Sequence, residues 1–369
     1  MRIALYQQRA LPVLAEEYKD ERIGGEEVQQ ALLAKALAAS GHEVRLIVGD
    51  FGQQDGAVFE GVTTLKTYGE HEGLPVVRFL YPRLWRFWQA LKRANPDVVY
   101  VSCAGMQVGI AALFCKKYGK RLVFRAASDS DCDPSKLLIR HARDKWLYLY
   151  GVRHADAILV QSQYQQGLLK QHFGRDSTVA AMLVEQAAQL RPAQDVSVLW
   201  VANLRHVKRP DRVLELARAM PQVQFHMAGG ASPAEQKLYE QIKLQAASLP
   251  NLVFHGAIAY RDIGKLFDRC KVFINTSDLE GFPNTFLQSW IRGVPVVAMF
   301  DPDQVIAKNA LGVSCPDVAA MQQAITQLLQ DAAQYRQCSA NALAHMQRHF
   351  SVEVILAPYL SAMQGKTAQ

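Results

Sequence analysis

Short apolar runs typical of buried β-strands alternate with amphipathic helix patterns along most of this chain. The chain begins with a strand pattern at residues 2–6, a helix pattern at about 26–40 and a second strand pattern at 43–48. Such alternation predicts a parallel β-sheet covered by helices, because a parallel crossover needs a helix-length connection. The same reasoning predicts further strands at 97–101, 121–124, 157–160, 198–201, 224–228, 253–255, 272–275 and 294–299, and helices at 210–219, 233–248, 260–268, 285–292 and 352–364.

The alternation pauses at the linker-like stretch 188–195 and then restarts. A chain of 369 residues is too long for one typical core, so two domains are the default expectation. We therefore predict the α/β class, with two doubly wound Rossmann-like domains at residues 1–190 and 191–350 that face a central cleft. The final helix, within residues 351–369, lies beyond the last strand, and we expect it to pack back across the domains.

Cysteine usage and hydropathy narrow the cellular setting. The six cysteines are scattered without a Cys-x-x-Cys pair, which argues against both a disulfide framework and a thiolate metal site. No segment approaches the roughly 18 apolar residues of a membrane-spanning helix, and the first strand begins without a signal peptide's apolar core. These features predict a cytoplasmic protein, either in solution or peripheral on the inner face of the cytoplasmic membrane.

Positive charge is concentrated in one part of the chain. From Arg78 to Arg153 there are 15 Lys and Arg residues against 5 Asp and Glu, which indicates a cationic face with an anionic partner. Two segments there, 81–93 and 136–146, mix aromatic residues with cations. They suit helices lying on an anionic membrane surface, and equally suit core helices whose cations are solvated. Nucleic acid is not an expected partner, because no binding motif accompanies the charge.

A glycine-bearing turn that carries Glu280 follows the strand pattern at 272–275. The stretch runs Ser-Asp-Leu-Glu-Gly-Phe-Pro-Asn-Thr-Phe-Leu-Gln at 277–288, and Gly-Val-Pro-Val-Val follows at 293–297. Glu280 therefore comes at the carboxyl end of a strand and just before a helix, where open α/β sheets bind ligands. This arrangement suits a nucleotide-sugar, with amides on the diphosphate and a carboxylate on the sugar. The alternative is an ordinary strand-turn-helix unit capped by Asn284 or Thr285.

These two stretches resemble the donor-site signature of the family-4 glycosyltransferases. The family has a glutamate followed eight positions later by a second one; this chain matches the first at Glu280 but has Gln288 at the second. The resemblance implies the two-Rossmann GT-B architecture, retention of configuration, and neither cofactor nor metal. It also implies that Glu280 holds the donor sugar and that Gln288 touches the ribose. The neighbouring donor-binding positions it implies are Gly281, Phe282, Asn284 and Thr285.

Three further segments match donor-binding parts of the same family. Lys208 matches a family lysine that stabilises the leaving diphosphate, whereas the family arginine is replaced by Asn203, and Arg205 is the expected substitute. The glycine pair Gly24 and Gly25 is expected to cover the diphosphate. Gly256 and Ile258 are expected at the turn that receives the nucleobase. A solvated basic loop and a simple helix start are the alternatives for the lysine and glycine segments, respectively.

The acceptor side is expected in the loop after strand 121–124. Arg125, Ser128 and Asp129 are the candidates there, although many family members have a histidine near this position. The alternating aspartates superficially resemble a metal loop, but the glycines and distal glutamate of an EF-hand are missing. A turn and capping role is the alternative.

Together, these observations predict an enzyme that moves a sugar from a nucleotide-sugar to a glycan or lipid-linked acceptor, in cell-surface polysaccharide or lipid-linked saccharide assembly. Gln288, Asn203 and the missing histidine support one alternative, a non-catalytic subunit that binds a nucleotide-sugar or glycan. A nucleotide-sugar epimerase on the same fold is the other alternative.

Overall fold

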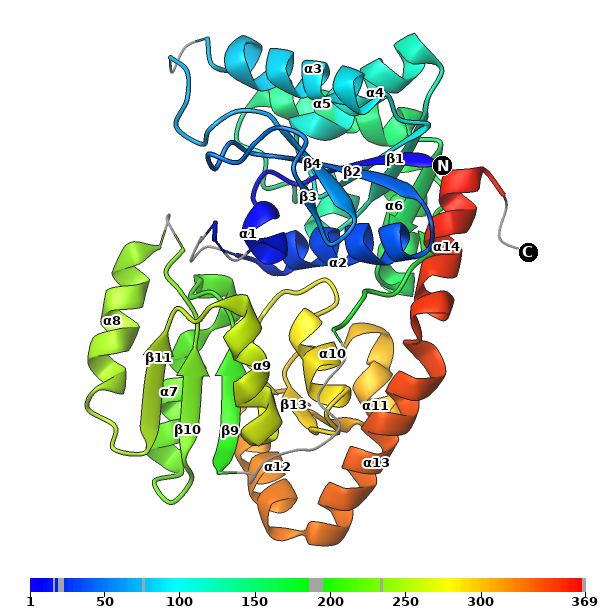
Figure 1. Ribbon diagram of the computed structural model, residues 1–369. Coiled ribbons are helices and arrows are strands. Elements are labelled where there is room, and N and C mark those ends of the chain that lie inside the picture. The colour runs from blue at the N-terminus through cyan, green and yellow to red at the C-terminus, as the bar shows by residue number, and fades with distance from the viewer. Residues whose placement is uncertain (16, 19–22, 75–76, 186–194, 233–234, 367–369) are drawn as a thin grey trace. The chain divides into compact units, whose positions relative to one another are not determined.

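The computed structural model describes residues 1–15, 17–18, 23–74, 77–185, 195–232 and 235–366. The chain forms two compact units, which are described separately (Figure 1). Unit 1 comprises Met1–Leu183 together with Val352–Gln369, and unit 2 comprises Val184–Ser351. The predicted linker at 188–195 lies outside the described residues except for Asp195.

Unit 1 is built on an eight-stranded sheet with the order β3-β4-β2-β1-β5-β6-β7-β8. Only the short β3 pairs antiparallel, with β4; the other described pairings are parallel. The strands are β1 (Arg2–Tyr6), β2 (Glu43–Val48), β3 (Val58–Phe59), β4 (Val62–Lys66), β5 (Val98–Ser102), β6 (Arg121–Arg125), β7 (Ala157–Val160) and β8 (Thr178–Val179).

Helices cover both faces of this sheet. Helices α3, α4 and α5 lie on one face, and α2 and α14 lie on the other (Figure 1). Helix α14 contacts β6, β7 and α2, so the C-terminal segment returns to unit 1. The helices are α1 (Leu11–Leu14), α2 (Gly25–Ala39), α3 (Trp85–Ala94), α4 (Met106–Tyr118), α5 (Ala142–His154), α6 (Gln163–Phe173) and α14 (Val352–Gln364), with short turns η1 (Phe79–Leu84) and η2 (Asp129–Cys132).

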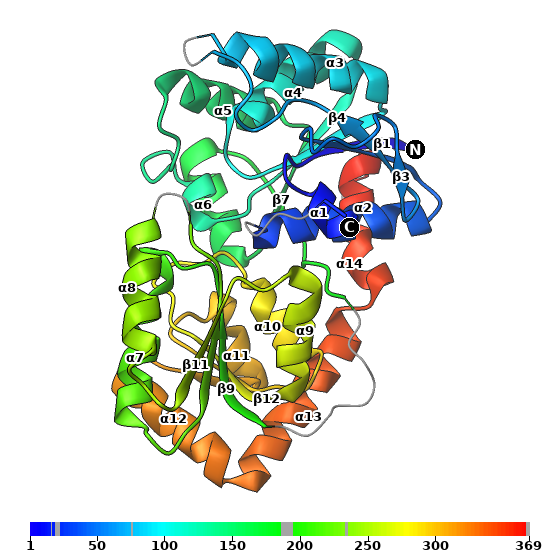
Figure 2. The same ribbon diagram turned by 60° about the vertical axis from the view of Figure 1, so that its left-hand side comes forward.

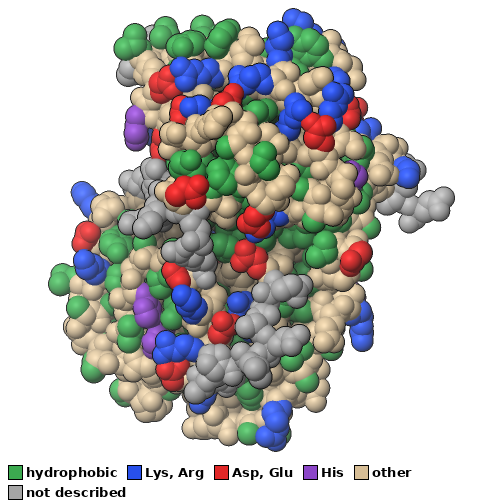
Figure 3. All heavy atoms as spheres, viewed as in Figure 1, with side chains coloured by type: hydrophobic (Ala, Val, Ile, Leu, Met, Phe, Trp, Pro, Cys, Tyr) green, Lys and Arg blue, Asp and Glu red, His purple; other side chains and the backbone are tan. Residues whose placement is uncertain are grey.

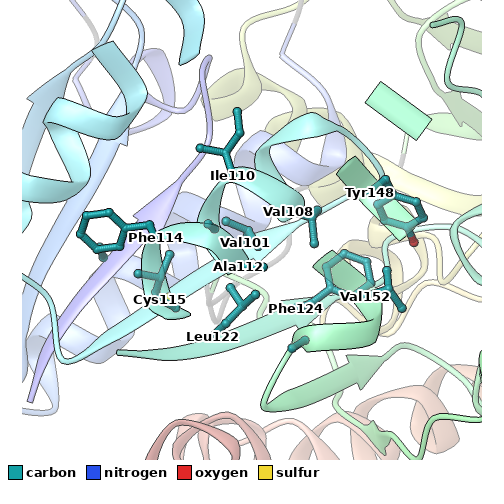
Figure 4. Close-up of a cluster of buried hydrophobic side chains, with 14 of the residues drawn as sticks. Val101, Val108, Ile110, Ala112, Phe114, Cys115, Leu122, Phe124, Tyr148 and Val152 are labelled. Carbon is teal, nitrogen blue, oxygen red and sulfur yellow. The ribbon is translucent and has the colours of Figure 1, made fainter. Parts of the chain in front are cut away.

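The core of unit 1 lies between its sheet and helices α4 and α5. Figure 4 shows side chains such as Phe114 from α4, Phe124 from β6 and Tyr148 from α5 gathered in one buried cluster. Gly109 of α4 and Gly151 of α5 let these two helices approach closely. A Cβ added to Gly109 would lie 2.2 Å from the carbonyl oxygen of Leu147, so only glycine fits this crossing.

Unit 2 repeats the doubly wound plan on a smaller, wholly parallel sheet of order β11-β10-β9-β12-β13-β14. Figure 2 shows α7, α8 and α12 on one side of this sheet and α9 and α10 on the other. The strands are β9 (Val196–Val201), β10 (Phe225–Ala228), β11 (Leu252–Gly256), β12 (Cys270–Asn275), β13 (Val296–Ala298) and β14 (Gly312–Ser314). The helices are α7 (Pro210–Ala219), α8 (Gln236–Ala246), α9 (Tyr260–Arg269), α10 (Asn284–Trp290), α11 (Val305–Asn309), α12 (Val318–Gln330) and α13 (Ala332–His349), with short turns η3 (His206–Lys208) and η4 (Pro302–Gln304).

The prediction of two doubly wound α/β units is confirmed, with local corrections. The predicted helix 233–248 is shorter, since α8 begins at Gln236 and ends at Ala246. The predicted strand 294–299 is also shorter: β13 begins at Val296, after a proline that has no N–H to donate to a neighbouring strand. In the basic segment 136–146, regular helix begins only at Ala142.

Candidate functional site

The connection between β12 and α10 places Glu280 at the carboxyl end of the unit 2 sheet. Strand β12 ends at Asn275, and α10 begins at Asn284. Apolar packing anchors the far end of this connection, since the Phe282 ring lies 6.4 Å from Phe286 and 6.2 Å from the buried Trp290. The turn around Glu280 therefore starts from a buried strand and ends on a buried helix.

Three side chains hold the Glu280 carboxylate. The Ser277 hydroxyl donates to Glu280 Oε1 at 2.7 Å, and Asn275 Nδ2 donates to the same oxygen at 3.2 Å. Lys208 Nζ donates to the other oxygen, Oε2, at 2.5 Å. The two residues that the sequence places in the same donor site are thus in direct contact, although 72 positions separate them in the chain.

The loop that carries Lys208 is fastened to the Glu280 turn by its backbone. Thr276 Oγ1 lies 2.8 Å from the carbonyl oxygen of Lys208 and 3.0 Å from that of Arg209. The Trp200 indole donates to this hydroxyl at 2.9 Å. The Asp278 amide donates to the carbonyl oxygen of Val207 at 2.9 Å. These bonds fix the position of the lysine backbone, while the long lysine side chain keeps its own rotatable bonds.

A second set of charges lies beside the Lys208–Glu280 pair. The Asp278 carboxylate accepts from Arg212 at 2.6 Å and from Arg209 at 3.3 Å. Arg205, the predicted substitute for the family arginine, is exposed and directly precedes η3. Its phosphate role stays a prediction. Asn275, Thr276, Ser277 and Trp200 were not among the predicted site residues, because a strand end shows no chemical pattern in one sequence.

Gln288 contacts Tyr260, which was not among the predicted site residues. Its side chain forms a hydrogen bond with the hydroxyl of Tyr260, at the start of α9. Burial, with the nearby Glu185 carboxylate, raises the pKa of this tyrosine well above its usual value, so it stays a neutral hydroxyl. Gln288 and Thr285 are half-buried on α10, as is Gly281 in the preceding turn. The expected ribose contact of Gln288 stays a prediction.

The predicted nucleobase turn follows β11. Gly256 is buried with φ +67°, a conformation that side chains disfavour, and its carbonyl oxygen accepts from the Gly229 amide at 2.8 Å. Ile258 lies half-buried two residues later. His255 Nε2 lies 2.9 Å from His226 Nδ1 on the neighbouring strand. Burial and this neighbour lower the pKa of His226 to about 4, which makes a structural, uncharged pair.

In unit 1, the predicted glycine pair lies at the start of α2. Gly24 precedes the helix, and Gly25 is its first residue. The Gly24 amide donates to the Glu27 carboxylate at 3.1 Å, and Arg9 forms an ion pair with Glu27 at 3.2 Å. The chain's own carboxylate thus holds one amide at this helix start. The diphosphate role of Gly24 and Gly25 stays a prediction.

The predicted acceptor residues follow β6. Arg125 is only 1% exposed, and its guanidinium lies 3.6 Å from the Glu26 carboxylate. Ser128 caps η2, and the Asp129 carboxylate accepts from Gln165 at 2.9 Å. In this structure Arg125 therefore supports the start of α2 from inside the unit, while Ser128 and Asp129 are half-buried.

Burial also perturbs one carboxyl group in this loop. Burial raises the pKa of Asp131 to about 6, although the amides of Ala127 and Ser128 donate to it at 2.9 and 3.2 Å. The carboxylate therefore ties the loop to its own backbone. Within the described part of the chain, no group of three or more His, Cys, Asp or Glu residues could hold a metal ion.

A cavity of about 370 Å³ lies at the carboxyl ends of β2 and β4 in unit 1. Its wall combines one exposed indole, that of Trp85, with planar polar side chains from α3 and from the loop after β2. The volume falls within the usual range for small-molecule sites. The lining residues are Asp50, Asp55, Lys66, Thr67, Trp85, Arg86, Gln89 and Arg93.

Two family matches follow one another along the chain. Residues 23–181 match the family Glycosyltransferase Family 4, and residues 184–345 match Glycosyl transferases group 1. The chain belongs to the family-4 glycosyltransferases. It is accordingly a glycosyltransferase of the GT-B architecture, as the sequence predicts.

Solved structures with the same fold are distant in sequence. Anabaena HepE, in complex with UDP and glucose, is 17% identical with a TM-score of 0.75, and the match covers 99% of both chains. Sucrose-phosphate synthase from Thermosynechococcus elongatus is 18% identical with a TM-score of 0.76, over 98% of both chains. The E. coli trehalose-6-phosphate structure bound with UDP-2-fluoro glucose is 14% identical with a TM-score of 0.73, over 100% of both chains. Among curated proteins, no sequence matches this glycosyltransferase.

Proposed function

We propose that this glycosyltransferase moves a sugar from a nucleotide-sugar to a glycan or lipid-linked acceptor with retention of configuration, in surface polysaccharide or lipid-linked saccharide assembly. The observation that carries the donor site is the contact of Lys208 with Glu280 beyond the carboxyl ends of neighbouring strands β9 and β12. Open α/β sheets bind ligands at this edge.

Lys208 and Glu280 act on different parts of the donor, the lysine on the diphosphate and the glutamate on the sugar. A lysine ammonium beside the diphosphate stabilises the negative charge that develops as the sugar–phosphate bond breaks. The Glu280 carboxylate accepts hydrogen bonds from sugar hydroxyls, and Ser277 and Asn275 keep it oriented. The leaving phosphate then takes the acceptor's proton on the same face of the sugar, so that configuration is retained without a metal. The UDP and UDP-sugar complexes of distant structural neighbours support a uridine donor.

Unit 1 offers a place for a saccharide acceptor in the cavity beside Trp85. The apolar face of a sugar ring stacks on an indole, and its hydroxyls bond to carboxylates, amides and guanidinium groups. Asp50, Gln89 and Arg93 supply these groups on the cavity wall. Ser128 and Asp129, at the end of β6, remain the candidates near the reacting hydroxyl.

Donor binding has a direct test in ligand-induced stabilisation. We expect one nucleotide-sugar among UDP-, GDP- and ADP-sugars to raise the melting temperature of the purified protein, because a ligand at 100 times its dissociation constant adds about 2.7 kcal/mol to folding stability. Transfer itself is checked by release of the nucleoside diphosphate with a glycan acceptor, and NMR of the product's anomeric proton tests retention. If none of these nucleotide-sugars, nor CMP- or dTDP-sugars, shifts the melting temperature, the donor proposal is contradicted.

We also propose that an aromatic–basic surface of unit 1 attaches the enzyme to an anionic membrane. It consists of Leu80, Tyr81, Leu138 and Trp146, all exposed, with the cations Arg78, Lys136, Arg140 and Arg143. Figure 3 shows hydrophobic side chains gathered along the outer edge of unit 1 over α3, with Lys and Arg beside them. The Arg143 guanidinium lies 3.3 Å from the Phe79 ring centre, which joins the two segments of this surface. In the described residues, no helix is long and apolar enough to span a bilayer.

A charge placed on this surface is expected to weaken membrane binding. Leu138 is 74% exposed, so Leu138→Glu costs little folding stability, yet it removes an apolar contact and repels an anionic headgroup. We expect several-fold weaker cosedimentation with phosphatidylglycerol–phosphatidylcholine vesicles at low salt. The matched control is Leu244→Glu in unit 2, where the leucine is 77% exposed. Equal binding by both variants, or no binding of the wild type, would overturn this surface.

A further inference from the structure

The ion pair between Lys208 and Glu280 has a consequence for ligand selection, because both members belong to the proposed donor site. Their side chains are only 20% and 11% exposed. A pair this sheltered is screened less by salt than a surface pair, and removing one partner leaves the other charge without compensation. An anion that binds Lys208 therefore competes with Glu280 for the same ammonium group.

The contacts around the pair show which member can move. Glu280 Oε1 is held by the Ser277 hydroxyl at 2.7 Å and by Asn275 at 3.2 Å, and both of these side chains are buried. Lys208 Nζ has Glu280 as its described partner, at the end of a four-carbon side chain. The lysine is therefore the mobile member and the carboxylate the fixed one.

We propose that Glu280 competes with the ligand's diphosphate for Lys208, and that this competition favours the nucleotide-sugar over the released nucleoside diphosphate. This inference rests on the proposed donor site. When a nucleotide-sugar binds, Lys208 moves to the diphosphate and sugar hydroxyls donate to the vacated Glu280 Oε2. When the bare nucleoside diphosphate binds, that oxygen has no hydroxyl partner and Lys208 is pulled back. Glu280 thus promotes product release as well as holding the sugar.

The neighbouring Asp278 provides a matched control. It carries the same charge on the same turn, but its partners are Arg209 and Arg212 rather than Lys208. Asp278→Asn and Glu280→Gln each remove one negative charge and keep the shape of the side chain. A gain in anion affinity that comes only from the general loss of charge would appear in both variants, whereas competition for Lys208 affects Glu280→Gln alone.

The test measures the affinity of inorganic pyrophosphate and of UDP by calorimetry, with Lys208→Met and the Glu280→Gln/Lys208→Met double variant included. We expect Glu280→Gln to bind both probes about 3- to 10-fold more tightly, because the probe no longer has to compete with the Lys208–Glu280 ion pair. This gain in affinity corresponds to about 0.7–1.4 kcal/mol. Asp278→Asn should stay within about twofold of the wild type. The double variant should bind no more tightly than Lys208→Met, because the competition requires the lysine.

The outcomes separate this inference from the donor site itself. If Glu280→Gln binds both probes no more tightly than the wild type, or if Asp278→Asn gains as much, the competition is overturned while the donor site stands. If Lys208→Met binds pyrophosphate and UDP as well as the wild type does, Lys208 does not contact the diphosphate, and both proposals fail. Circular dichroism melting checks that each variant is folded, and Glu280→Ala repeats the test should Glu280→Gln unfold.

Discussion

Glu280→Gln is expected to lower kcat/KM for sugar transfer by about 10²-fold or more, and Lys208→Met by about 10²–10³-fold. The lysine acts on charge that develops only as the sugar–phosphate bond breaks, and removal of one such group costs other enzymes about 2.7–4 kcal/mol. The glutamate orients the sugar whose bond is breaking, so removing it also raises the free energy of the transition state. Initial rates of nucleoside diphosphate release measure both effects.

The kinetic pattern distinguishes the two roles from mere loss of structure. Lys208→Met should lower kcat more than it raises KM, because its charge matters most in the transition state. Asp278→Asn, on the same turn but paired with Arg209 and Arg212, should keep activity within a few-fold of the wild type. Measurements at low conversion are needed, because Glu280→Gln is also expected to retain its product. Glu280→Gln with more than a tenth of wild-type activity would refute the assigned sugar contact.

The elements that position the site follow from local sequence patterns. Strands β1, β2 and β7 and helices α7 and α14 begin and end at the predicted residues, since each has a clear apolar period and a turn or breaker at its ends. The element boundaries shifted where tertiary contacts decide them. Strand β3 has two residues and β14 has three, which is too short for a periodic signal to identify.

The contacts within the site depended on information that local patterns lack. Glu280 and Lys208 were both assigned to the donor site. Their opposite charges lie at neighbouring strand ends and pair with each other, and one sequence does not reveal that pairing. Arg125 illustrates the same limit. An arginine that ends a strand suggests an exposed cation, whereas the fold buries it beside Glu26 on a helix almost 100 residues away in sequence.

The close crossing of α4 and α5 is a further feature that no local pattern revealed. Gly109 faces the backbone of Leu147, and Gly151 faces that of Val108 and Gly109. In both cases an added Cβ would meet main-chain atoms, which cannot rotate away as a side-chain end can. Cysteine and aromatic side chains of α4 and α5 fill the cluster beside this crossing (Figure 4). The glycines therefore set the separation of the two helices, and hence the packing of the unit 1 core.

Gly109→Ala is expected to destabilise unit 1 by about 3 kcal/mol or more, because its methyl group would overlap the carbonyl oxygen of Leu147 and force α4 and α5 apart. The control is the same substitution at Gly167, an exposed position inside α6 with nothing within 4 Å of an added Cβ. There alanine should stabilise by roughly 0.5–1 kcal/mol, since it restricts the unfolded chain and favours helix. In urea unfolding, the free energy of unfolding should fall for Gly109→Ala and rise for Gly167→Ala, and hydrogen exchange of α4 locates the change. Equal urea midpoints for the two variants would mean that α4 and α5 cross farther apart.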